Sequence, residues 1–426
     1  MTSSEGNILE SISSMIRIPY TAPFPPAIIY PPTAIGKSAG VTALQEFLLA
    51  PNSSDRTSKS RTLVLTGAGV SVESGLADYR GENGTYRLNK KYRPIFYTEF
   101  ISNHEARKRY WARSFLGWPT MRNARPNKSH MAIALLGATG LVHGIITQNV
   151  DSLHHLAHPQ FTSSTINPSY RTIFDSLAHP GLPPLVPPIV EIHGTLRHTA
   201  CLTCSFLHPR NQFQHTLEYL NPAWTEFLHN AQNKDALNPN TTRGERIRTN
   251  PDGDVDLPGA PYTKFRYPPC PKCLSEGGVE VDKDGAHVPC LSGGDYCTKK
   301  NTKGILKPSV VFFGEGVQSN TKNAADQLVK DSERILVIGS SLAAYSALKL
   351  VKEVARRGKG VGIINIGGVR GEAEFFEADS GPRLRLELPA ADVLGDVVEQ
   401  LEGRSIDWAV HPGNLQFGES ISGLGG

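Results

Sequence analysis

The sequence is poor in the features that mark secreted, membrane-spanning or nucleic-acid-binding proteins. Its 426 residues include only six cysteines, and six cysteines in a chain of this length do not make a disulfide framework. No apolar run approaches the roughly 20 residues of a membrane-spanning helix, so we expect no membrane insertion. The formal net charge is only +4, so we predict no direct nucleic-acid binding. The length suits a core domain with additions, and the oligomeric state stays open.

The stretch from Leu63 to Arg80 also lacks G-x-G-x-x-G, the usual spacing of a dinucleotide-binding turn. It nevertheless begins with an apolar run, 63–65, that is typical of a buried parallel strand, and Gly67 and Gly69 follow. A strand, a glycine turn and a helix start can bind a pyrophosphate, because glycine lets the backbone approach the anion and the helix offers N–H groups. A tight strand-to-helix turn without a ligand is an equally common alternative.

A polar cluster follows the apolar run at 142–146. Gln148, Asn149 and Asp151 lie directly after this predicted strand, in the segment T-Q-N-V-D-S-L-H. Ligands of open α/β sheets bind beyond the carboxyl ends of the strands, so these side chains are candidates for a ligand pocket. The alternative is a strand-to-helix turn in which Asp151 caps the helix.

A single histidine, His193, ends a short predicted strand at 189–192, and Gly194 follows it. An unperturbed imidazole titrates near pH ~6.5, so this ring can accept a proton at physiological pH. A lone histidine is more often structural than catalytic. A catalytic role is favoured for His193 because the chain also contains two candidate ligand-binding stretches.

Four of the six cysteines form two C-x2-C pairs: Cys201, Cys204, Cys270 and Cys273. Two such pairs supply four thiolates to a tetrahedral Zn²⁺ and leave no open position for catalysis. Cys290 and Cys297 are a competing pair with a longer spacing. A redox role is the minor alternative, because neither C-x2-C pair lies at a strand-to-helix turn.

The remaining pattern predicts alternating strands and helices, which indicates an α/β fold with a parallel sheet. A second glycine turn begins at Gly339, after a predicted strand at 335–338. We expect a helical lid within 86–119 and interpret Arg107–Arg109 as a solvated basic helix face. Other expected strands lie at 306–315, 361–364 and 384–388, and other expected helices at 41–49, 99–115, 132–136 and 392–401.

Taken together, these stretches resemble the sirtuin family of NAD-dependent protein deacylases. The resemblance is carried by G-A-G-x-S-x-x-S-G-L-x-D-Y-R at 67–80, T-Q-N-V-D at 147–151, His193-Gly194, the C-x2-C pairs and L-K-P-x-V-V-x-F-G-E at 306–315. One departure is Ala77, where the family has proline; the change loosens the loop and removes no chemistry. The segments L-N-P-A-W at 220–224 and P-D-G-D-V at 251–255 are similar to the class II branch, which contains the mitochondrial sirtuin-four type.

The resemblance implies a Rossmann-like parallel-sheet NAD-binding domain with a small zinc-binding module and a helical lid. It implies an irregular N-terminal arm at 1–60, a catalytic domain at 61–401 and a flexible tail at 402–426. Within the catalytic domain the implied parts are Rossmann-like segments at 61–85, 120–198 and 305–401, a helical cofactor-loop part at 86–119, and a zinc-binding module at 199–304. Polar insertions are expected at 156–188, 229–250 and 275–303.

The resemblance also implies a reaction. The acyl oxygen of a modified lysine attacks C1′ of the NAD ribose, nicotinamide leaves, and the acyl group ends on O-acyl-ADP-ribose. NAD is then a consumed co-substrate, one structural Zn²⁺ is bound per chain, and acyl-lysine proteins are the substrates. His193 would act as general base, with Asn149 and Asp151 in the nicotinamide pocket.

The implied cofactor-binding residues are Gly67, Ala68, Gly69, Ser71, Gly75, Asp78, Tyr79, Arg80, Gln148, Asn149, Asp151, Gly339, Ser340, Ser341, Asn365 and Gly367. The implied metal ligands are Cys201, Cys204, Cys270 and Cys273. The implied acyl-lysine tunnel and substrate edge are Val310, Val311, Phe312, Phe313, Gly314 and Glu315.

Two other functions fit the same motifs. One is an NAD-dependent protein mono-ADP-ribosyltransferase acting at the same site, and the other is an NAD-binding regulatory module with low activity. The branch resemblance implies the mitochondrial matrix, against Glu5 and Glu10, which are unusual in an acid-poor presequence; a nuclear or cytoplasmic location stays open. The acyl group and the protein substrates are not identified by the sequence.

Overall fold

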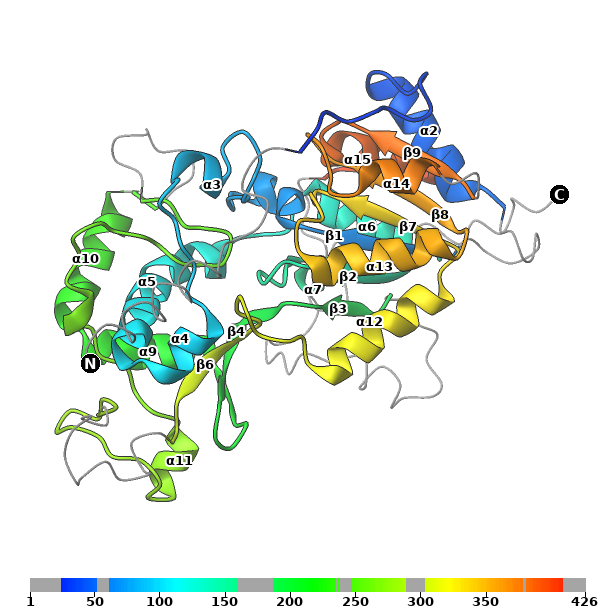
Figure 1. The fold of residues 1–426 in the computed structure, drawn as a ribbon. Coiled ribbons are helices and arrows are strands. Elements are labelled where there is room, and N and C mark those ends of the chain that lie inside the picture. Colours follow the sequence, from blue (N-terminus) through cyan, green and yellow to red (C-terminus); the bar gives the residue numbers. More distant parts are fainter. Residues whose placement is uncertain are drawn as a thin grey trace, which may run out of the picture.

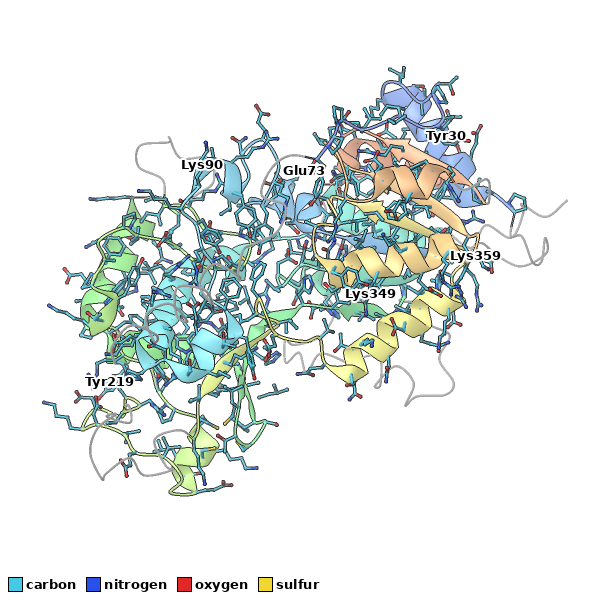
Figure 2. All side chains as sticks on the ribbon, viewed as in Figure 1. Tyr30, Glu73, Lys90, Tyr219, Lys349 and Lys359 are labelled. Atoms are coloured by element: carbon cyan, nitrogen blue, oxygen red, sulfur yellow. The ribbon has the colours of Figure 1, made fainter. Side chains whose placement is uncertain are left out.

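The computed structural model describes residues 24–51, 61–158, 187–234, 236–237, 247–288, 303–377 and 381–408. These residues form a larger sheet domain and a smaller part built from helices and a short second sheet (Figure 1). Tyr30 and Lys359 lie on the sheet domain and Tyr219 lies at the opposite end of the molecule (Figure 2). Within the described residues, no helix combines the length and the apolar character needed to span a membrane.

A six-stranded parallel sheet forms the centre of the sheet domain, in the order β3-β2-β1-β7-β8-β9. The carboxyl ends of all six strands therefore lie along one edge. The strand order reverses between β1 and β7, and doubly wound sheets bind their ligands at such a reversal. The strands are β1 (Thr62–Thr66), β2 (Val142–Thr147), β3 (Ile189–Glu191), β7 (Arg334–Ile338), β8 (Gly360–Ile364) and β9 (Arg383–Leu386).

Helices cover both faces of this sheet, which is why its strands are continuous apolar runs. Val64 points to one face, and Leu63 and Leu65 to the other. The first face packs against α2 (Lys37–Leu49), α6 (Lys128–Ala138) and α15 (Ala390–Glu402). The second face packs against α12 (Ser319–Asp331), α13 (Tyr345–Arg356) and α14 (Glu372–Glu377).

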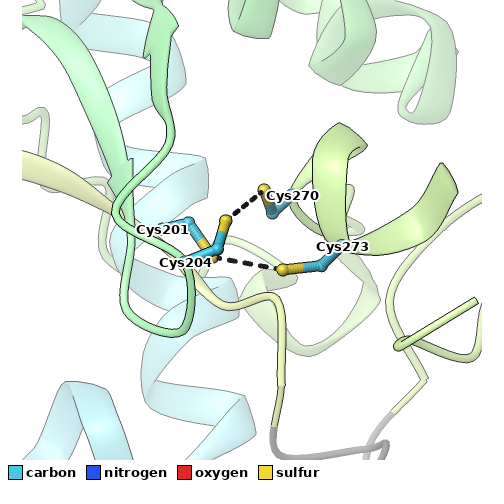
Figure 3. A group of neighbouring side chains, drawn as sticks. All are labelled: Cys201, Cys204, Cys270 and Cys273. Atoms are coloured by element: carbon cyan, nitrogen blue, oxygen red, sulfur yellow. Dashed lines mark hydrogen bonds between the residues drawn. The ribbon is translucent and has the colours of Figure 1, made fainter. Parts of the chain in front are cut away.

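The smaller part contains an antiparallel sheet in the order β5-β4-β6. Two cysteines near the end of β4 face two cysteines at the start of α11 (Figure 3). The strands are β4 (Gly194–Cys201), β5 (Leu207–Pro209) and β6 (Leu306–Val310). The helices are α3 (Thr85–Leu88), α4 (Tyr97–Ser102), α5 (His104–Asn123), α9 (Arg210–Leu220), α10 (Pro222–Asn233), η3 (Tyr262–Lys264) and α11 (Pro271–Ser275). Two short helices of the sheet domain, η1 (Ala68–Ser74) and α7 (Leu153–Leu156), follow β1 and β2.

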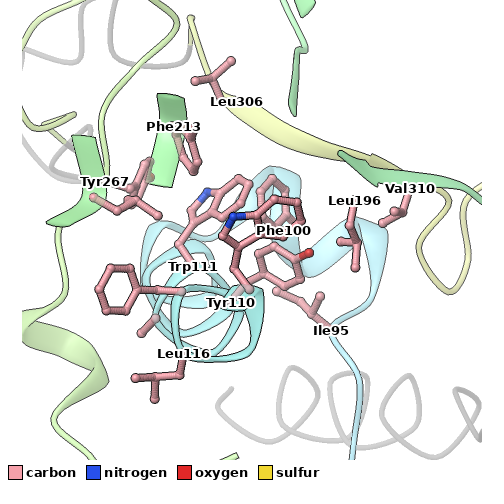
Figure 4. Packing of buried hydrophobic residues seen from close by; sticks show 14 of the residues in the cluster. Ile95, Phe100, Tyr110, Trp111, Leu116, Leu196, Phe213, Tyr267, Leu306 and Val310 are labelled. Atoms are coloured by element: carbon pink, nitrogen blue, oxygen red, sulfur yellow. The ribbon is translucent and has the colours of Figure 1, made fainter. Parts of the chain in front are cut away.

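One aromatic core holds the smaller part together (Figure 4). Trp111 of α5 is fully buried, and its ring centroid lies 4.5 Å from that of Phe213 in α9. Cys201 and Cys270 belong to the same buried cluster. The helical part and the zinc-binding part, which we expected to be separate, therefore share one hydrophobic core.

Three expectations about the fold are wrong. The segment 306–315 does not join the parallel sheet, because β6 pairs with β4 in the second sheet. The arm expected to be irregular at 1–60 is not so at 37–49, because the helix expected at 41–49 is present as α2, begins at Lys37 and packs its apolar face into the core of the sheet domain. The expected insertion at 229–250 begins inside α10, which continues to Asn233. Most of the expected insertion at 156–188 and the end of the expected tail lie outside the described residues.

The interpretation of Arg107–Arg109 as a solvated face is wrong for Arg107. This side chain is 5% exposed. Its guanidinium donates to the hydroxyl of Tyr267 at 2.8 Å and to the carbonyl oxygen of Phe100 at 2.9 Å. The arginine thus ties α5 to a loop that comes much later in the chain.

Candidate active site

A cavity of about 1000 Å³ lies where the sheet domain meets the smaller part. The segments after β1, β2, β7 and β8 line one side, and residues of α5 and the segment after β6 line the other. The lining residues of the cavity include His193 and the six residues Val310–Glu315. They also include every expected cofactor-binding residue except Gly75. Gly75 instead has φ +83° and ends η1, where its amide donates to the carbonyl oxygen of Val72. Its role is to close that helix.

The two glycine turns of the sheet domain pack directly against each other. The amide of Gly67 donates to the carbonyl oxygen of Ile338 at 3.1 Å, and that of Gly69 donates to the carbonyl oxygen of Gly339 at 2.9 Å. A Cβ atom at Gly67 or Gly69 would lie 2.8 Å from the carbonyl oxygen of Gly339. We expected these glycines to make room for a pyrophosphate. In the structure they first of all allow the two turns to touch.

A buried hydrogen-bonded group lies at the end of β2. The Ser71 hydroxyl donates to Oδ2 of Asp151 at 2.7 Å and accepts from Nδ2 of Asn149 at 3.0 Å. Nδ2 of Asn149 also donates to the carbonyl oxygen of Gly67 at 3.1 Å. Asp151 is 5% exposed, and its second oxygen accepts from the amide of Leu153 at 2.9 Å. Asp151 therefore lines the cavity and also accepts a hydrogen bond from the first amide of α7, although the N-cap residue of that helix is Ser152.

Two buried histidines lie behind this group. The rings of His130 and His154 are 4.8 Å apart, and Nε2 of His154 shares a 2.9 Å hydrogen bond with the Thr66 hydroxyl. Burial lowers the pKa of His130 to about 4 and that of His154 well below its usual value. Both rings are therefore neutral at physiological pH, so neither places a positive charge beside Asp151.

His193 lies at the cavity wall, two residues after the end of β3 and directly before β4. Its Nδ1 is 3.0 Å from the carbonyl oxygen of Gln148, and its Nε2 is 2.8 Å from the hydroxyl of Ser346. A carbonyl oxygen can only accept, so Nδ1 carries the proton and Nε2 keeps its lone pair. Burial lowers the pKa of the ring, against a smaller opposing effect of the Gln148 carbonyl. The histidine is thus held as a neutral imidazole with Nε2 as the basic atom.

The segment after β6 forms the opposite wall of the cavity. The amide of Val311 donates to the carbonyl oxygen of His193 at 2.8 Å, which places this segment beside the histidine. The carbonyl oxygen of Phe313 accepts from the amide of Tyr97 at 2.9 Å. We expected the edge formed by Phe313, Gly314 and Glu315 to pair with a substrate strand. The Phe313 carbonyl oxygen therefore already accepts one hydrogen bond within the chain before any strand is added.

Aromatic and charged side chains close the cavity on the side of α5. Tyr79 and Tyr86 stack with ring centroids 5.5 Å apart, and the guanidinium of Arg80 lies 5.1 Å from the centre of the Tyr86 ring. Asp78 accepts from the amide of Gly81 at 2.8 Å. These contacts fix the loop after η1, which carries three of the expected cofactor-binding residues.

A buried ionic group joins the same wall to the loop at 250–255. Nη2 of Arg113 lies 2.5 Å from Oδ2 of Asp254, and the Tyr92 hydroxyl donates to Oδ2 of Asp252 at 2.6 Å. Burial and the neighbouring Asp254 raise the pKa of Asp252 to about 8. The loop that we singled out for its P-D-G-D-V sequence is therefore anchored at the cavity.

The four predicted metal ligands form one cluster, with all four sulfurs within 4.8 Å of one another. The Sγ atoms are 3.7 Å apart both for Cys201 and Cys273 and for Cys204 and Cys270. Sulfurs at tetrahedral corners about 2.3 Å from one Zn²⁺ are about 3.8 Å apart, so the spacing fits a Zn²⁺ site. None of these cysteines lines the cavity. The competing Cys290 and Cys297 lie outside the described residues.

Sequence reasoning missed several cavity residues. Ser346 lies in the first turn of α13, the helix that follows the second glycine turn. That position in the sequence is the signal that could have identified it as a cavity residue. Glu387 follows β9 and accepts from the amide of Gly367 at 2.9 Å. Phe24 and Pro26 line the cavity from the N-terminal arm, where the proline-rich sequence carries no periodic signal.

Comparison with known proteins gives the family. Residues 67–162 and 185–346 match the Sir2 family. The NAD-dependent protein deacylase SIR4 of Batrachochytrium dendrobatidis is 36% identical over 342 residues, which are 80% of this chain and 90% of that protein. The NAD-dependent protein deacylase SRT2 of Arabidopsis thaliana is 34% identical, covering 74% of this chain and 68% of that protein. The NAD-dependent protein deacylase Sirt4 of Drosophila melanogaster is 31% identical, covering 86% and 89%. This chain therefore belongs to the Sir2 family, the sirtuins.

Proposed function

We propose that this protein is an NAD-dependent protein-lysine deacylase that releases nicotinamide and forms O-acyl-ADP-ribose. The observation that carries the proposal is the cavity itself. It brings the neutral His193, the Ser71–Asn149–Asp151 group and the segment Val310–Glu315 to one space. The names of the relatives, all NAD-dependent protein deacylases, support the same activity.

The residues around the cavity fit NAD as a co-substrate. We assign the pyrophosphate to the turns Gly67–Gly69 and Gly339–Ser341, and the adenosine half to Asn365 and Gly367, at the carboxyl ends of the central strands. We assign the nicotinamide half to Asn149 and Asp151, and the ribose next to it to Gln148. When bound, NAD supplies an electrophilic ribose carbon and nicotinamide as leaving group.

The side chains have distinct roles in this proposal. Nε2 of His193 accepts a proton from a ribose hydroxyl, as general base. The hydrogen bonds from Ser71 and from the amide of Leu153 hold the Asp151 carboxylate in one position at the cavity wall. The segment Val310–Glu315 guides the acyl-lysine, with Val310 and Phe312 both 8% exposed beside it. Positioning of this kind supplies much of the rate enhancement in many enzymes.

The four cysteines hold one Zn²⁺ in a structural role. Four thiolates leave no open coordination position, and the cluster is packed into the aromatic core instead of the cavity. The ion would therefore stabilise the smaller part and take no part in the reaction.

Incubation with NAD and a panel of acyl-lysine peptides tests the activity. We expect free lysine peptide, nicotinamide and O-acyl-ADP-ribose in equal amounts by mass spectrometry. Transfer of label from NAD onto protein without loss of the acyl group would show the rival ADP-ribosyltransferase activity. Binding of NAD without turnover of any peptide in the panel would show the regulatory module.

We also propose that the protein works in mitochondria. The support is the resemblance of the segments 220–224 and 251–255 to the mitochondrial sirtuin-four type, together with the similarity to Drosophila Sirt4. Imaging of the full chain with a C-terminal tag is the test. A signal confined to the nucleus or the cytoplasm would contradict the proposal.

A further inference from the structure

The described part of the N-terminal arm runs along the outer edge of the sheet domain. Tyr30 forms an antiparallel bridge with Arg385 of β9, in which the amide of Tyr30 donates at 3.1 Å and the amide of Arg385 donates at 2.7 Å. Ala34 belongs to the same hydrophobic core as the apolar face of α2, and Ile29 packs against that core. Tyr30 lies at the end of the sheet domain that carries α2 (Figure 2). The arm is therefore attached to the last strand of the sheet.

Arg385 connects this attachment to the turn after β8. Its side chain is 0% exposed. The guanidinium donates to the carbonyl oxygens of Asn365 at 2.9 Å and Gly367 at 2.7 Å, and pairs with Glu372 at 2.6 Å. The backbone of Arg385 thus binds the arm. The side chain of Arg385 binds the turn that we assign to the adenosine half of NAD.

The arm also touches this turn directly. A Cβ atom at Gly368 would lie 1.8 Å from the carbonyl oxygen of Pro25 and 2.9 Å from Cβ of Phe24. The glycine is therefore required for the arm to cross the turn. At this crossing, Phe24 and Pro26 line the cavity together with Ile366, whose side chain is 68% exposed.

We propose that the N-terminal arm is a wall of the NAD site, and that Phe24 and Pro26 contact the adenine base of the dinucleotide. The inference rests on the proposed function, since it assigns a further subsite of the same cavity. An aromatic ring, a proline ring and an exposed isoleucine line the cavity beside Asn365 and Gly367 and offer an apolar surface there. A purine base has apolar faces that stack on such surfaces. The arm then determines affinity for the adenosine half of the co-substrate and makes no contact with the reacting atoms.

Isothermal titration of the full chain with NAD and with ADP-ribose tests this subsite. Phe24→Ala should weaken both ligands by about tenfold, the usual size of a lost base-stacking contact. Nicotinamide inhibition and the KM for peptide should stay within about twofold, because both act at the other end of the cavity. Ile28→Ala is the matched control in the same arm, since Ile28 is 77% exposed and does not line the cavity.

Gly368→Ala provides a second, independent variant. The added methyl group must displace the backbone of Pro25, so this variant should also weaken NAD and ADP-ribose. In the double variant Phe24→Ala, Gly368→Ala, the second substitution should cost less than it does alone, because both act through the arm. Additive effects would mean that Gly368→Ala acts on the turn and not through the arm, and would overturn this step. Thermal unfolding of each variant separates loss of folding from loss of binding.

The outcomes distinguish this inference from the proposed function. If the unaltered protein binds neither NAD nor ADP-ribose, the proposed function fails. If it binds both, and Phe24→Ala binds them with unchanged affinity, only the role of the arm is overturned.

Discussion

The backbone carbonyl of Gln148 lies 3.0 Å from Nδ1 of His193 and fixes the tautomer of the histidine. The side chain of the same glutamine donates to the Ser340 hydroxyl at 2.6 Å, in the second glycine turn. One residue thus orients the proposed base and ties it to the turn assigned to the pyrophosphate. The placement of the base relative to the co-substrate therefore depends on the backbone at the end of β2.

Replacement of His193 by alanine should remove the general base. We expect deacylation to fall by roughly 10²–10⁴-fold, while NAD affinity changes little, because the two glycine turns hold most of the co-substrate. Asn149→Ala should impair nicotinamide release as well as the later steps. Parallel assays of nicotinamide release and peptide deacylation, with NAD affinity measured separately, check both variants. Near-normal deacylation by the His193 variant would show that another group is the base.

The pH profile should reflect the buried environment of His193. Burial lowers the pKa of this ring below the usual value near ~6.5. The base is active when unprotonated, so activity should persist as the pH falls below that value and should be lost only at the lowered pKa. The acidic limb of kcat/KM, measured between pH 4 and pH 8 in steps of about half a unit, is the readout. An acidic limb above about pH 6.5 would mean that a different group titrates or that the histidine is more exposed in solution.

Removal of one zinc ligand should destabilise the smaller part. Cys270→Ser breaks the four-thiolate set, and metal binding is coupled to folding in such sites. We expect about one Zn per chain by elemental analysis before the substitution, and a melting temperature lower by more than about 5 °C after it, which corresponds to ~2 kcal/mol or more. Cys290→Ser is the control and should change metal content and melting temperature much less. A fully folded protein without metal would contradict the assignment.

Lys307 should determine how well the substrate segment is ordered. Its Nζ lies 3.1 Å from Oε2 of Glu315, and the other contact of that oxygen is the amide of Phe312 at 2.8 Å. Lys307→Met leaves this carboxylate without its cation, a loss of about 1–3 kcal/mol in a mostly buried pair. We expect the KM for peptide to rise about tenfold and the KM for NAD to change less than about twofold. Lys349→Met, in α13 and not among the cavity-lining residues, is the control. An equal effect of both variants would argue against the assignment.

Much of the sheet domain could be predicted from the sequence, for a simple physical reason. Its strands are buried on both faces, so 63–65, 335–338 and 361–364 are continuous apolar runs that begin and end clearly. The polar residues that follow these runs come together because parallel strands end at one edge. That is why Asn149, Asp151 and the second glycine turn line one cavity with the first.

The parts that could not be predicted depend on contacts between distant segments. The apolar run at 310–313 resembles that of a core strand, and the pattern does not reveal that β6, which ends at Val310, pairs with β4. Arg107 is buried because the Tyr267 hydroxyl, from a distant loop, accepts its hydrogen bond. Phe24 lines the cavity because Tyr30 pairs with the last strand of the sheet, and nothing in a proline-rich arm indicates that pairing.

The shared aromatic core of the smaller part sets a limit on how this protein can be divided. Trp111 and Phe115 come from one stretch of chain, Phe213 and Phe265 come from another, and the cysteine cluster is buried with them. A fragment ending after α5 would leave these tryptophan and phenylalanine side chains in water, and a fragment containing only the cysteine module would lack half of its interior. Limited proteolysis should therefore release neither piece as a stable species, and excision of either should yield insoluble protein.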